Sequence, residues 1–285
     1  MTADEWLEKA AAFLEERGVP EARPSAEFLL AEVLGVGRAT ALSRGRTPLN
    51  ERQALHFWDW VKRRGRREPL AYILGTQPFL GLDIEVTRDC LIPRPETEEL
   101  VVECERLLKS SAASAPKILE IGTGTGCVAI ALAQLLPAAT VIATDLSDKA
   151  LALAFKNALA HNAHRRIRFV REDLFSGRQS LRGWADLLVS NPPYIPTKDL
   201  DALEPEVKAE PRLALDGGRD GLDAIRAIVA GAAAMLKPGG HLALEIEERQ
   251  GPAVSGLLRA AGFKGVVVKK DAQGRDRIAV GKLVE

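Results

Sequence analysis

The chain has 285 residues, with 39 basic and 39 acidic side chains and no formal net charge. This length fits one large domain plus a small one. The neutral balance gives no support to a protein that coats a polyanion, because such proteins carry a basic face. The three cysteines, Cys90, Cys104 and Cys127, have no paired spacing, which argues against a disulfide framework or a zinc site.

The sequence carries no targeting or membrane signal. Its first five residues include two acidic side chains and lack an apolar core. No apolar run approaches the roughly 20 residues that cross a bilayer. The four histidines, at positions 56, 161, 164 and 241, show no metal-ligand spacing, so we expect no metal site. These features predict a cytoplasmic protein that does not contact membranes.

Residues 4–66 have the pattern of helices alone. Trp6, Ala10 and Phe13 recur at helical spacing, and apolar residues in 28–34 mark a second helix. A third helix follows Pro48 and ends in the basic run 62–67. We interpret that run as a solvated helix end rather than a docking patch. The pattern predicts a helical N-terminal domain over residues 1–70.

Residues 71–92 change character. The alternating stretch 79–86 predicts a hairpin that links two domains. The sequence Ile-Pro-Arg-Pro-Glu-Thr-Glu at 92–98 then leads into a helix, and residues 110–116 predict a loop.

From residue 117 onward, strand patterns alternate with helix patterns, which predicts an α/β fold with a doubly wound, mostly parallel sheet. Two last strands flank a turn at 271–274, and a turn of this kind makes them antiparallel. We therefore expect a single domain over residues 93–285. Its predicted strands are 118–121, 140–144, 167–170, 187–190, 242–246, 266–269 and 278–280, and its predicted helices are 128–136, 146–162, 224–236 and 252–261.

A glycine-rich loop follows the first of these strands. It contains Gly122, Thr123, Gly124 and Gly126, with Glu120 two positions before it. The dinucleotide fingerprint G-x-G-x-x-G would need its third glycine one residue later. The spacing fits S-adenosylmethionine better, because the ammonium group of that molecule can be held by Glu120, directly or through water. The alternative is a loop that only packs a strand against a helix.

Acidic residues follow the next two strands. Asp145 ends the second strand, where a carboxylate can accept both ribose hydroxyls, or can cap the following helix. Asp173 follows the third strand and could accept from an adenine amino group, while Leu174 or Phe175 packs against the ring. The order of these signals along successive strand ends favours a cofactor site.

The most informative stretch is Asn191, Pro192, Pro193 and Tyr194. Two successive prolines cannot continue a central strand, so the chain leaves the sheet at Asn191. The Asn191 amide and the Pro192 carbonyl could then accept both protons of a planar –NH2 group, with Tyr194 against its flat face. The alternative is a rigid turn at the end of a strand.

Together these residues resemble the HemK/PrmC family of glutamine methyltransferases. Residues 92–98 look like the family's motif before the catalytic domain, and residues 210–222 are similar to its long downstream signature. The resemblance implies a class I methyltransferase fold and a small helical N-terminal domain. It also implies methyl transfer from S-adenosylmethionine to the glutamine side chain of a Gly-Gly-Gln loop in class I peptide chain release factors.

By this resemblance, the catalytic residues are Asn191, Pro192 and Tyr194, and Asn191 also borders the cofactor. Pro193 belongs to the substrate site. Arg94 and Glu96 either line the substrate mouth or fix a proline-rich bend. We expect a monomer that needs no nucleic acid.

Two other functions remain open from the sequence. A nucleic-acid amino-methyltransferase would use the same acceptors for adenine or cytosine, but it should flip its base and carry a basic region. A non-catalytic S-adenosylmethionine-binding module is the other, and the intact motif at 191–194 argues against it.

Overall fold

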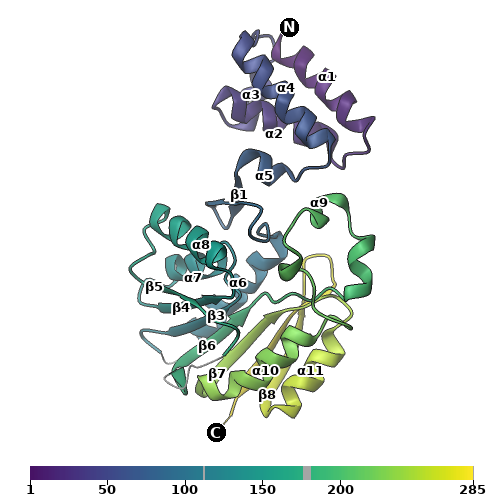
Figure 1. The fold of residues 1–285 in the computed structure, drawn as a ribbon. Coiled ribbons are helices and arrows are strands. Elements are labelled where there is room, and N and C mark those ends of the chain that lie inside the picture. The colour runs from purple at the N-terminus through teal and green to yellow at the C-terminus, as the bar shows by residue number, and fades with distance from the viewer. Residues whose placement is uncertain (112, 176–180, 285) are drawn as a thin grey trace. The chain divides into compact units, whose positions relative to one another are not determined.

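A computed structural model describes residues 1–111, 113–175 and 181–284 (Figure 1). It divides into two compact units. The helical unit contains Met1–Thr76 and the short segment Glu204–Ala209. The sheet unit contains Gln77–Leu203 and Glu210–Glu285. None of the described helices is long and apolar enough to cross a membrane.

The helical unit is built from α1 (Ala3–Glu15), α2 (Ala22–Leu34), α3 (Arg38–Ser43), α4 (Glu51–Gly65) and α5 (Leu70–Leu74). Capping boxes start the two longest amphipathic helices. At α1 the Thr2 and Glu5 side chains each accept from the backbone N–H of the other, and Asn50 and Gln53 do the same at α4. Each box satisfies two backbone N–H groups that the first helical turn cannot pair.

The core of the helical unit joins α1, α2 and α4. Leu7, Leu14, Leu29 and Phe57 are almost completely buried there. Burial of one such side chain contributes about 1.5–3 kcal/mol, which is the main reason that these short helices are stable together.

The segment Glu204–Ala209, with helix α9 (Pro205–Lys208), is held in the helical unit by ion pairs. Glu206 lies 2.7 Å from Arg64 Nη1 and 2.7 Å from Arg67 Nε. The prediction of a solvated basic helix end is therefore wrong for these two arginines, and Arg64 is buried. Burial opposes ionisation of Glu206, but hydrogen bonds from Arg67 and Arg64 outweigh it and lower its pKa to about 2.

The sheet unit contains a seven-stranded sheet with the order β5-β4-β3-β6-β7-β9-β8. Strands β3 to β7 pair in parallel, whereas β9 is antiparallel to both β7 and β8. This confirms the predicted doubly wound sheet and its antiparallel strand. The strands are β3 (Lys117–Ile121), β4 (Thr140–Asp145), β5 (Ile167–Arg171), β6 (Ala185–Ser190), β7 (Leu236–Glu245), β8 (Phe263–Lys270) and β9 (Asp276–Leu283).

One detail of the chain path differs from the sequence prediction. Strand β7 begins at Leu236, so the Pro-Gly-Gly sequence at 238–240 lies inside the strand rather than before it. The β6–β7 ladder accommodates this sequence through a register shift between Ala185 and Leu187. The order of the strands, which the sequence pattern does not give, places β9 between β7 and β8.

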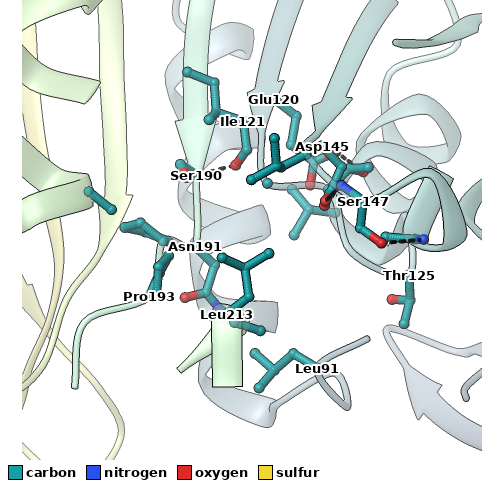
Figure 2. A pocket seen from close by; sticks show the side chains of 18 of the residues that line it. Leu91, Glu120, Ile121, Thr125, Asp145, Ser147, Ser190, Asn191, Pro193 and Leu213 are labelled. Carbon is teal, nitrogen blue, oxygen red and sulfur yellow. Dashed lines mark hydrogen bonds between the residues drawn. The ribbon is translucent and has the colours of Figure 1, made fainter. Parts of the chain in front are cut away.

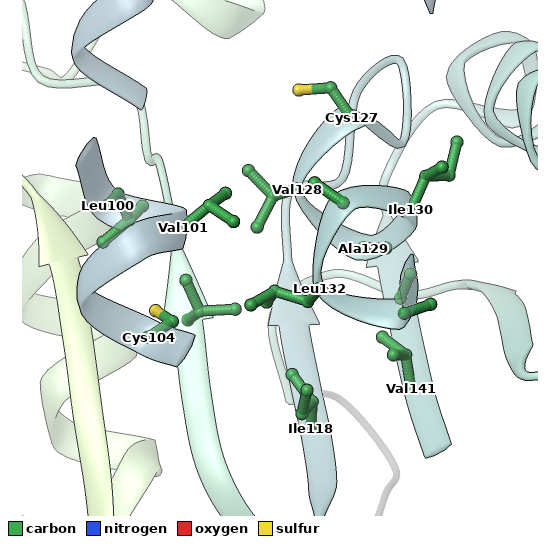
Figure 3. Close-up of a cluster of buried hydrophobic side chains, with 14 of the residues drawn as sticks. Leu100, Val101, Cys104, Ile118, Cys127, Val128, Ala129, Ile130, Leu132 and Val141 are labelled. Atoms are coloured by element: carbon green, nitrogen blue, oxygen red, sulfur yellow. The ribbon is translucent and has the colours of Figure 1, made fainter. Parts of the chain in front are cut away.

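Helices cover both faces of the sheet. The helices α6 (Pro95–Lys109), α7 (Cys127–Leu135) and α8 (Asp148–Ala160) share one core, part of which Figure 3 shows. The helices α10 (Asp223–Met235) and α11 (Gly251–Ala260) share the other. Strand β3 divides its side chains between the two cores, with Ile118 in the first and Leu119 in the second. This alternation is the two-residue period of a strand buried on both faces.

A separate two-stranded sheet, β1 (Thr76–Phe79) and β2 (Leu82–Glu85), lies in the region where the sequence predicts a hairpin. Asn157 of α8 anchors its second strand by accepting from the Glu85 N–H and donating to the Glu85 carbonyl.

We expect Glu206→Gln to destabilise the helical unit by roughly 2 kcal/mol at pH 7, allowing for solvent screening of the ion pairs. The pKa of Glu206 is depressed in the folded state, so its contribution is present above the unfolded pKa and is lost as pH falls toward 2. The difference in unfolding free energy between variant and parent should therefore shrink as pH falls from 5 to 3.

Urea unfolding followed by tryptophan emission measures this difference, since Trp6, Trp58 and Trp60 lie in the helical unit. Glu204→Gln is the matched control, because the Glu204 side chain is 69% exposed and its loss should change little. If Glu206→Gln destabilises the protein equally at pH 5 and pH 3, the ionised Glu206 carboxylate is not the source of the stability.

Candidate active site

The site lies where β3 sits between its parallel neighbours β4 and β6, with the crossovers running to opposite sides. Open α/β sheets bind ligands at such a switch point, beyond the carboxyl ends of the strands. A pocket of about 290 Å³ lies there (Figure 2). The predicted site residues that line it are Arg94, Glu120, Gly122, Thr123, Asp145, Asp173, Leu174, Asn191, Pro192 and Pro193.

The glycines of the loop after β3 have two different roles. Gly122 and Gly124 have positive φ angles of 73° and 54°, and a Cβ on either would meet open space. Gly126 also has a positive φ, but a Cβ there would lie 3.0 Å from the Cβ of Ala154 in α8. Gly122 lines the pocket and leaves room there, whereas Gly124 and Gly126 do not line it. Gly126 allows α7 and α8 to approach.

Asp145 connects the ends of β4 and β3. Its Oδ2 accepts from the Gly124 N–H at 2.9 Å, and its Oδ1 accepts from the Ser147 N–H at 2.9 Å. The N-cap of α8 is Ser147, whose hydroxyl accepts from the Ala150 N–H, so Asp145 is not the helix cap. Each carboxylate oxygen keeps lone-pair capacity toward the pocket, which suits a pair of ribose hydroxyls.

Glu120 is buried beneath the loop, with 3% of its surface exposed. Its Oε2 accepts from the Thr123 hydroxyl at 2.7 Å. Burial raises the pKa of Glu120 to about 7, against the hydrogen bond from Thr123. A carboxylate in this state gains most from a nearby cation, so it fits the ammonium group of S-adenosylmethionine.

Past β5, Asp173 and Leu174 line the pocket, and Leu174 has a left-handed φ of 52°. Phe175 takes a different path. Its ring lies so close to Gly231 of α10 that a Cβ on that glycine would clash with it, and Phe175 is not among the residues that line the pocket. Of the two apolar candidates for the adenine face, the geometry favours Leu174.

The chain leaves β6 at Asn191, as the two prolines predict. Asn191, Pro192 and Pro193 line the pocket. The Asn191 amide nitrogen donates to Thr97 Oγ1 at 3.0 Å. The Tyr194 hydroxyl instead donates to Glu245 Oε1 at 3.2 Å, and Tyr194 is not among the pocket-lining residues, so its packing on a substrate amide stays a prediction.

Residues 210–222, which carry the downstream signature, form hydrogen bonds with the chain just after this turn. The Ile195 N–H donates to the Leu215 carbonyl, and the Gly217 N–H donates to the Ile195 carbonyl. Gln250 also donates to the carbonyls of Tyr194 and Gly221. The end of the turn at 191–194 is thus held by the Gln250 side chain at Tyr194 and by two backbone hydrogen bonds at the next residue, Ile195.

The proline-rich stretch before α6 is clamped by a buried carboxylate. Glu210 accepts from the Ile92 N–H at 2.8 Å and pairs with Arg94. Burial raises the pKa of Glu210 despite the attraction of Arg94. Glu96 does not line the pocket, and its carboxylate lies 3.6 Å from Arg275. Arg94 therefore both fixes the bend and borders the pocket, while Glu96 remains an untested substrate contact.

Apolar side chains form another part of the pocket wall. Leu91, Pro93 and Leu213 line it, and the Leu213 side chain is 61% exposed. Figure 2 labels Leu91 and Leu213 at the pocket. An exposed leucine on the wall of a pocket is a candidate contact for the apolar part of a ligand. Cys127 lines the pocket as well, but burial raises its pKa to about 12, so it stays a thiol and acts as a packing residue.

Sequence patterns did not identify Thr97 and Glu245 as parts of the site. Glu245 is fully buried at the end of β7, and its Oε2 accepts from the Thr97 hydroxyl at 2.7 Å. An acidic residue at the end of an apolar strand pattern is the one local signal that could have identified it.

Residues 5–75 match the family described as PrmC N-terminal domain, and residues 102–209 match the family described as Methyltransferase small domain. A release factor glutamine methyltransferase from Geobacter sulfurreducens is 44% identical over 97% of this chain and 95% of its own length. One from Cereibacter sphaeroides is 43% identical over 99% of both chains. The crystal structure of a methyltransferase from Pyrococcus furiosus has a TM-score of 0.53 at 22% identity, over 72% of this chain and 91% of that one.

We expect Asp145→Ala to weaken binding of S-adenosylmethionine by at least tenfold, about 1.4 kcal/mol, because it removes the hydroxyl acceptor and releases the Gly124 N–H. Asp145→Asn keeps an acceptor for one of the two N–H groups, so its affinity for S-adenosylmethionine should lie between those of the parent and Asp145→Ala. Calorimetric titration measures both affinities. Equal affinity of Asp145→Ala and the parent would remove Asp145 from the cofactor site.

Proposed function

We propose that this chain, which belongs to the release factor glutamine methyltransferase family, methylates the side-chain nitrogen of the glutamine in the Gly-Gly-Gln motif of class I peptide chain release factors. The observation that carries the proposal is that two acceptors for an –NH2 group, on Asn191 and Pro192, line the same pocket as the glycine loop. The enzyme depends on S-adenosylmethionine.

The chain's own residues would hold the cofactor at the ends of three strands. Glu120 offers a buried carboxylate to the ammonium group, Asp145 offers acceptors to the ribose, and Asp173 offers one to the adenine amino group. Gly122, which lines the pocket, leaves open space for the amino-acid part of the cofactor. S-adenosylmethionine supplies a methyl group on a positively charged sulfur, which leaves as the neutral thioether of S-adenosylhomocysteine.

On the substrate side, the difficulty is the weak nucleophilicity of an amide nitrogen, whose lone pair is shared with its carbonyl. Asn191 Oδ1 and the Pro192 carbonyl would accept the two N–H protons and so direct the lone pair toward the methyl group. Orientation of this kind can supply up to about 7–11 kcal/mol of a barrier. The same two acceptors stabilise the positive charge that develops on the nitrogen, and the proton can leave after transfer.

Recognition of a folded substrate needs more surface than a glutamine side chain offers. We assign the glutamine to a site made by Asn191, Pro192, Pro193 and Tyr194, with Arg94 and Glu96 at its border. We assign docking of the release factor to the helical domain at 1–70, linkage to residues 71–92, and catalysis to 93–285. These bounds are part of the proposal.

The test is incubation of the protein with a class I release factor and methyl-tritiated S-adenosylmethionine, followed by mass spectrometry of the Gly-Gly-Gln peptide. We expect one methyl group on that glutamine. A free peptide with the same sequence should be a weak substrate, because it lacks docking contacts and must be ordered on binding. Label on DNA or RNA, with none on the release factor, would replace the proposal with a nucleic-acid amino-methyltransferase.

We expect Asn191→Ala to lower the rate of methyl transfer by about 100-fold or more, because it removes an acceptor that acts mainly in the transition state. Affinity for S-adenosylmethionine should change little, since the glycine loop and Asp145 are untouched. Single-turnover kinetics together with calorimetry separate these two quantities. A near-normal rate in the variant would exclude Asn191 from the chemistry.

A further inference from the structure

The Asn191 carboxamide is one end of a chain of hydrogen bonds inside the sheet unit. Its nitrogen donates to Thr97 Oγ1 at 3.0 Å, and the Thr97 hydroxyl donates to Glu245 Oε2 at 2.7 Å. The other oxygen of Glu245 accepts from the Tyr194 hydroxyl. Thr97 comes from α6, Glu245 from β7, and the other two residues from the turn after β6. Three separate elements therefore meet at one buried carboxylate.

The direction of this chain follows from the number of protons available. Thr97 has one hydroxyl proton, and Glu245 in its ionised form can only accept, so that proton then goes to Glu245. The Thr97 oxygen can then only accept a hydrogen bond from Asn191. The group of the Asn191 carboxamide that faces Thr97 must therefore be the nitrogen, which donates, and not the oxygen. Among the described residues, this carboxamide is held by Thr97 through its nitrogen, so Oδ1 remains available to a substrate.

Methyl transfer as proposed above needs that orientation. A carboxamide rotated by half a turn would present two protons to the substrate –NH2 group, and donor would face donor. The two orientations have nearly the same shape, so packing alone cannot distinguish them. The ionised Glu245 at the other end of the hydrogen-bond chain can distinguish them, because it sets the direction of the Thr97 hydroxyl.

We propose that Glu245, acting through Thr97, fixes the Asn191 carboxamide with its oxygen toward the substrate, so that Thr97 and Glu245 are positioning residues for methyl transfer. The proposal rests on the proposed function for its consequence in catalysis. The orientation of the Asn191 carboxamide itself does not depend on which substrate the enzyme uses.

The pH dependence of activity follows from the state of Glu245. Burial raises its pKa to about 7; Thr97, Arg277 of β9 and Tyr194 favour the ionised form, and Glu96 of α6 opposes it. Once protonated, Glu245 can donate to Thr97, whose own proton is then free to face Asn191 Oδ1 and turn the amide. The single-turnover rate at saturating cofactor should therefore fall as pH decreases below 7, and Thr97→Val should flatten this limb.

The kinetic test is a double-mutant cycle. We expect Thr97→Val to lower the single-turnover rate by roughly 10- to 100-fold, the scale on which misplacement of a reacting group acts. Thr97→Ser keeps the hydroxyl and should restore most of the rate. In an Asn191→Ala background, Thr97→Val should have no further effect, because its target is gone. Glu103→Gln, which alters another buried carboxylate of the α6 region, is the control and should leave the rate unchanged.

A full independent effect of Thr97→Val in the Asn191→Ala background would overturn the proposal, and so would an equal loss of cofactor affinity. A second measurement needs no substrate. In ¹⁵N spectra of the full chain, the Asn191 side-chain amide, identified by its absence in Asn191→Ala, should exchange slowly with solvent and faster in Thr97→Val. Unchanged exchange would refute the orientation, whereas slow exchange in a protein that methylates no release factor would refute the proposed function alone.

Discussion

The site depends on the register of β3 against its two parallel neighbours. Ile121 is paired with Thr144 of β4 and with Ser190 of β6, so β3 and β6 leave the sheet at one level, and β4 ends one residue later, at Asp145. Gly122 and Asn191 are the first residues beyond β3 and β6. A shift by one residue would invert the side chains of the strand and move Glu120 to the other face. The side chains of Ser190 and Thr144 reinforce the register by donating to the carbonyls of Ile121 and Glu120.

Three buried carboxylates serve this region, each in a different way. Glu120 lies under the glycine loop, Glu210 holds the proline-rich bend, and Glu245 accepts hydrogen bonds from two hydroxyl groups. Burial raises the pKa of all three, so each is costly unless its neighbours or a ligand favour the charge. The three buried carboxylates therefore lower the stability of the fold, but they fix the positions of polar groups before the substrate binds. Electrostatic catalysis usually requires such preorganised groups.

The sequence alone predicts the parts of the site that sit at strand ends. Glycine spacing, an acidic residue after β4 and two prolines after β6 are local patterns, and the parallel sheet brings them together without further information. Contacts between distant segments are different. Asn191 and Thr97 are 94 residues apart, and Thr97 and Glu245 are 148 apart, so no local periodicity relates them. The same limit explains why the insertion of β9 and the pairing of Arg64 with Glu206 were not foreseen.

The path of the chain through Glu204–Ala209 has a consequence for any attempt to take the protein apart. The polypeptide passes between the two units at 76–77, again at 203–204 and again at 209–210. No single cut therefore yields both units intact. A fragment that begins after α5 would keep Glu206 but lose Arg64 and Arg67, leaving a carboxylate-bearing loop without its cations between the turn at 191–194 and the signature at 210–222. The helical unit is in this sense assembled from segments on both sides of the turn at 191–194, and it is more than a segment that precedes the sheet unit.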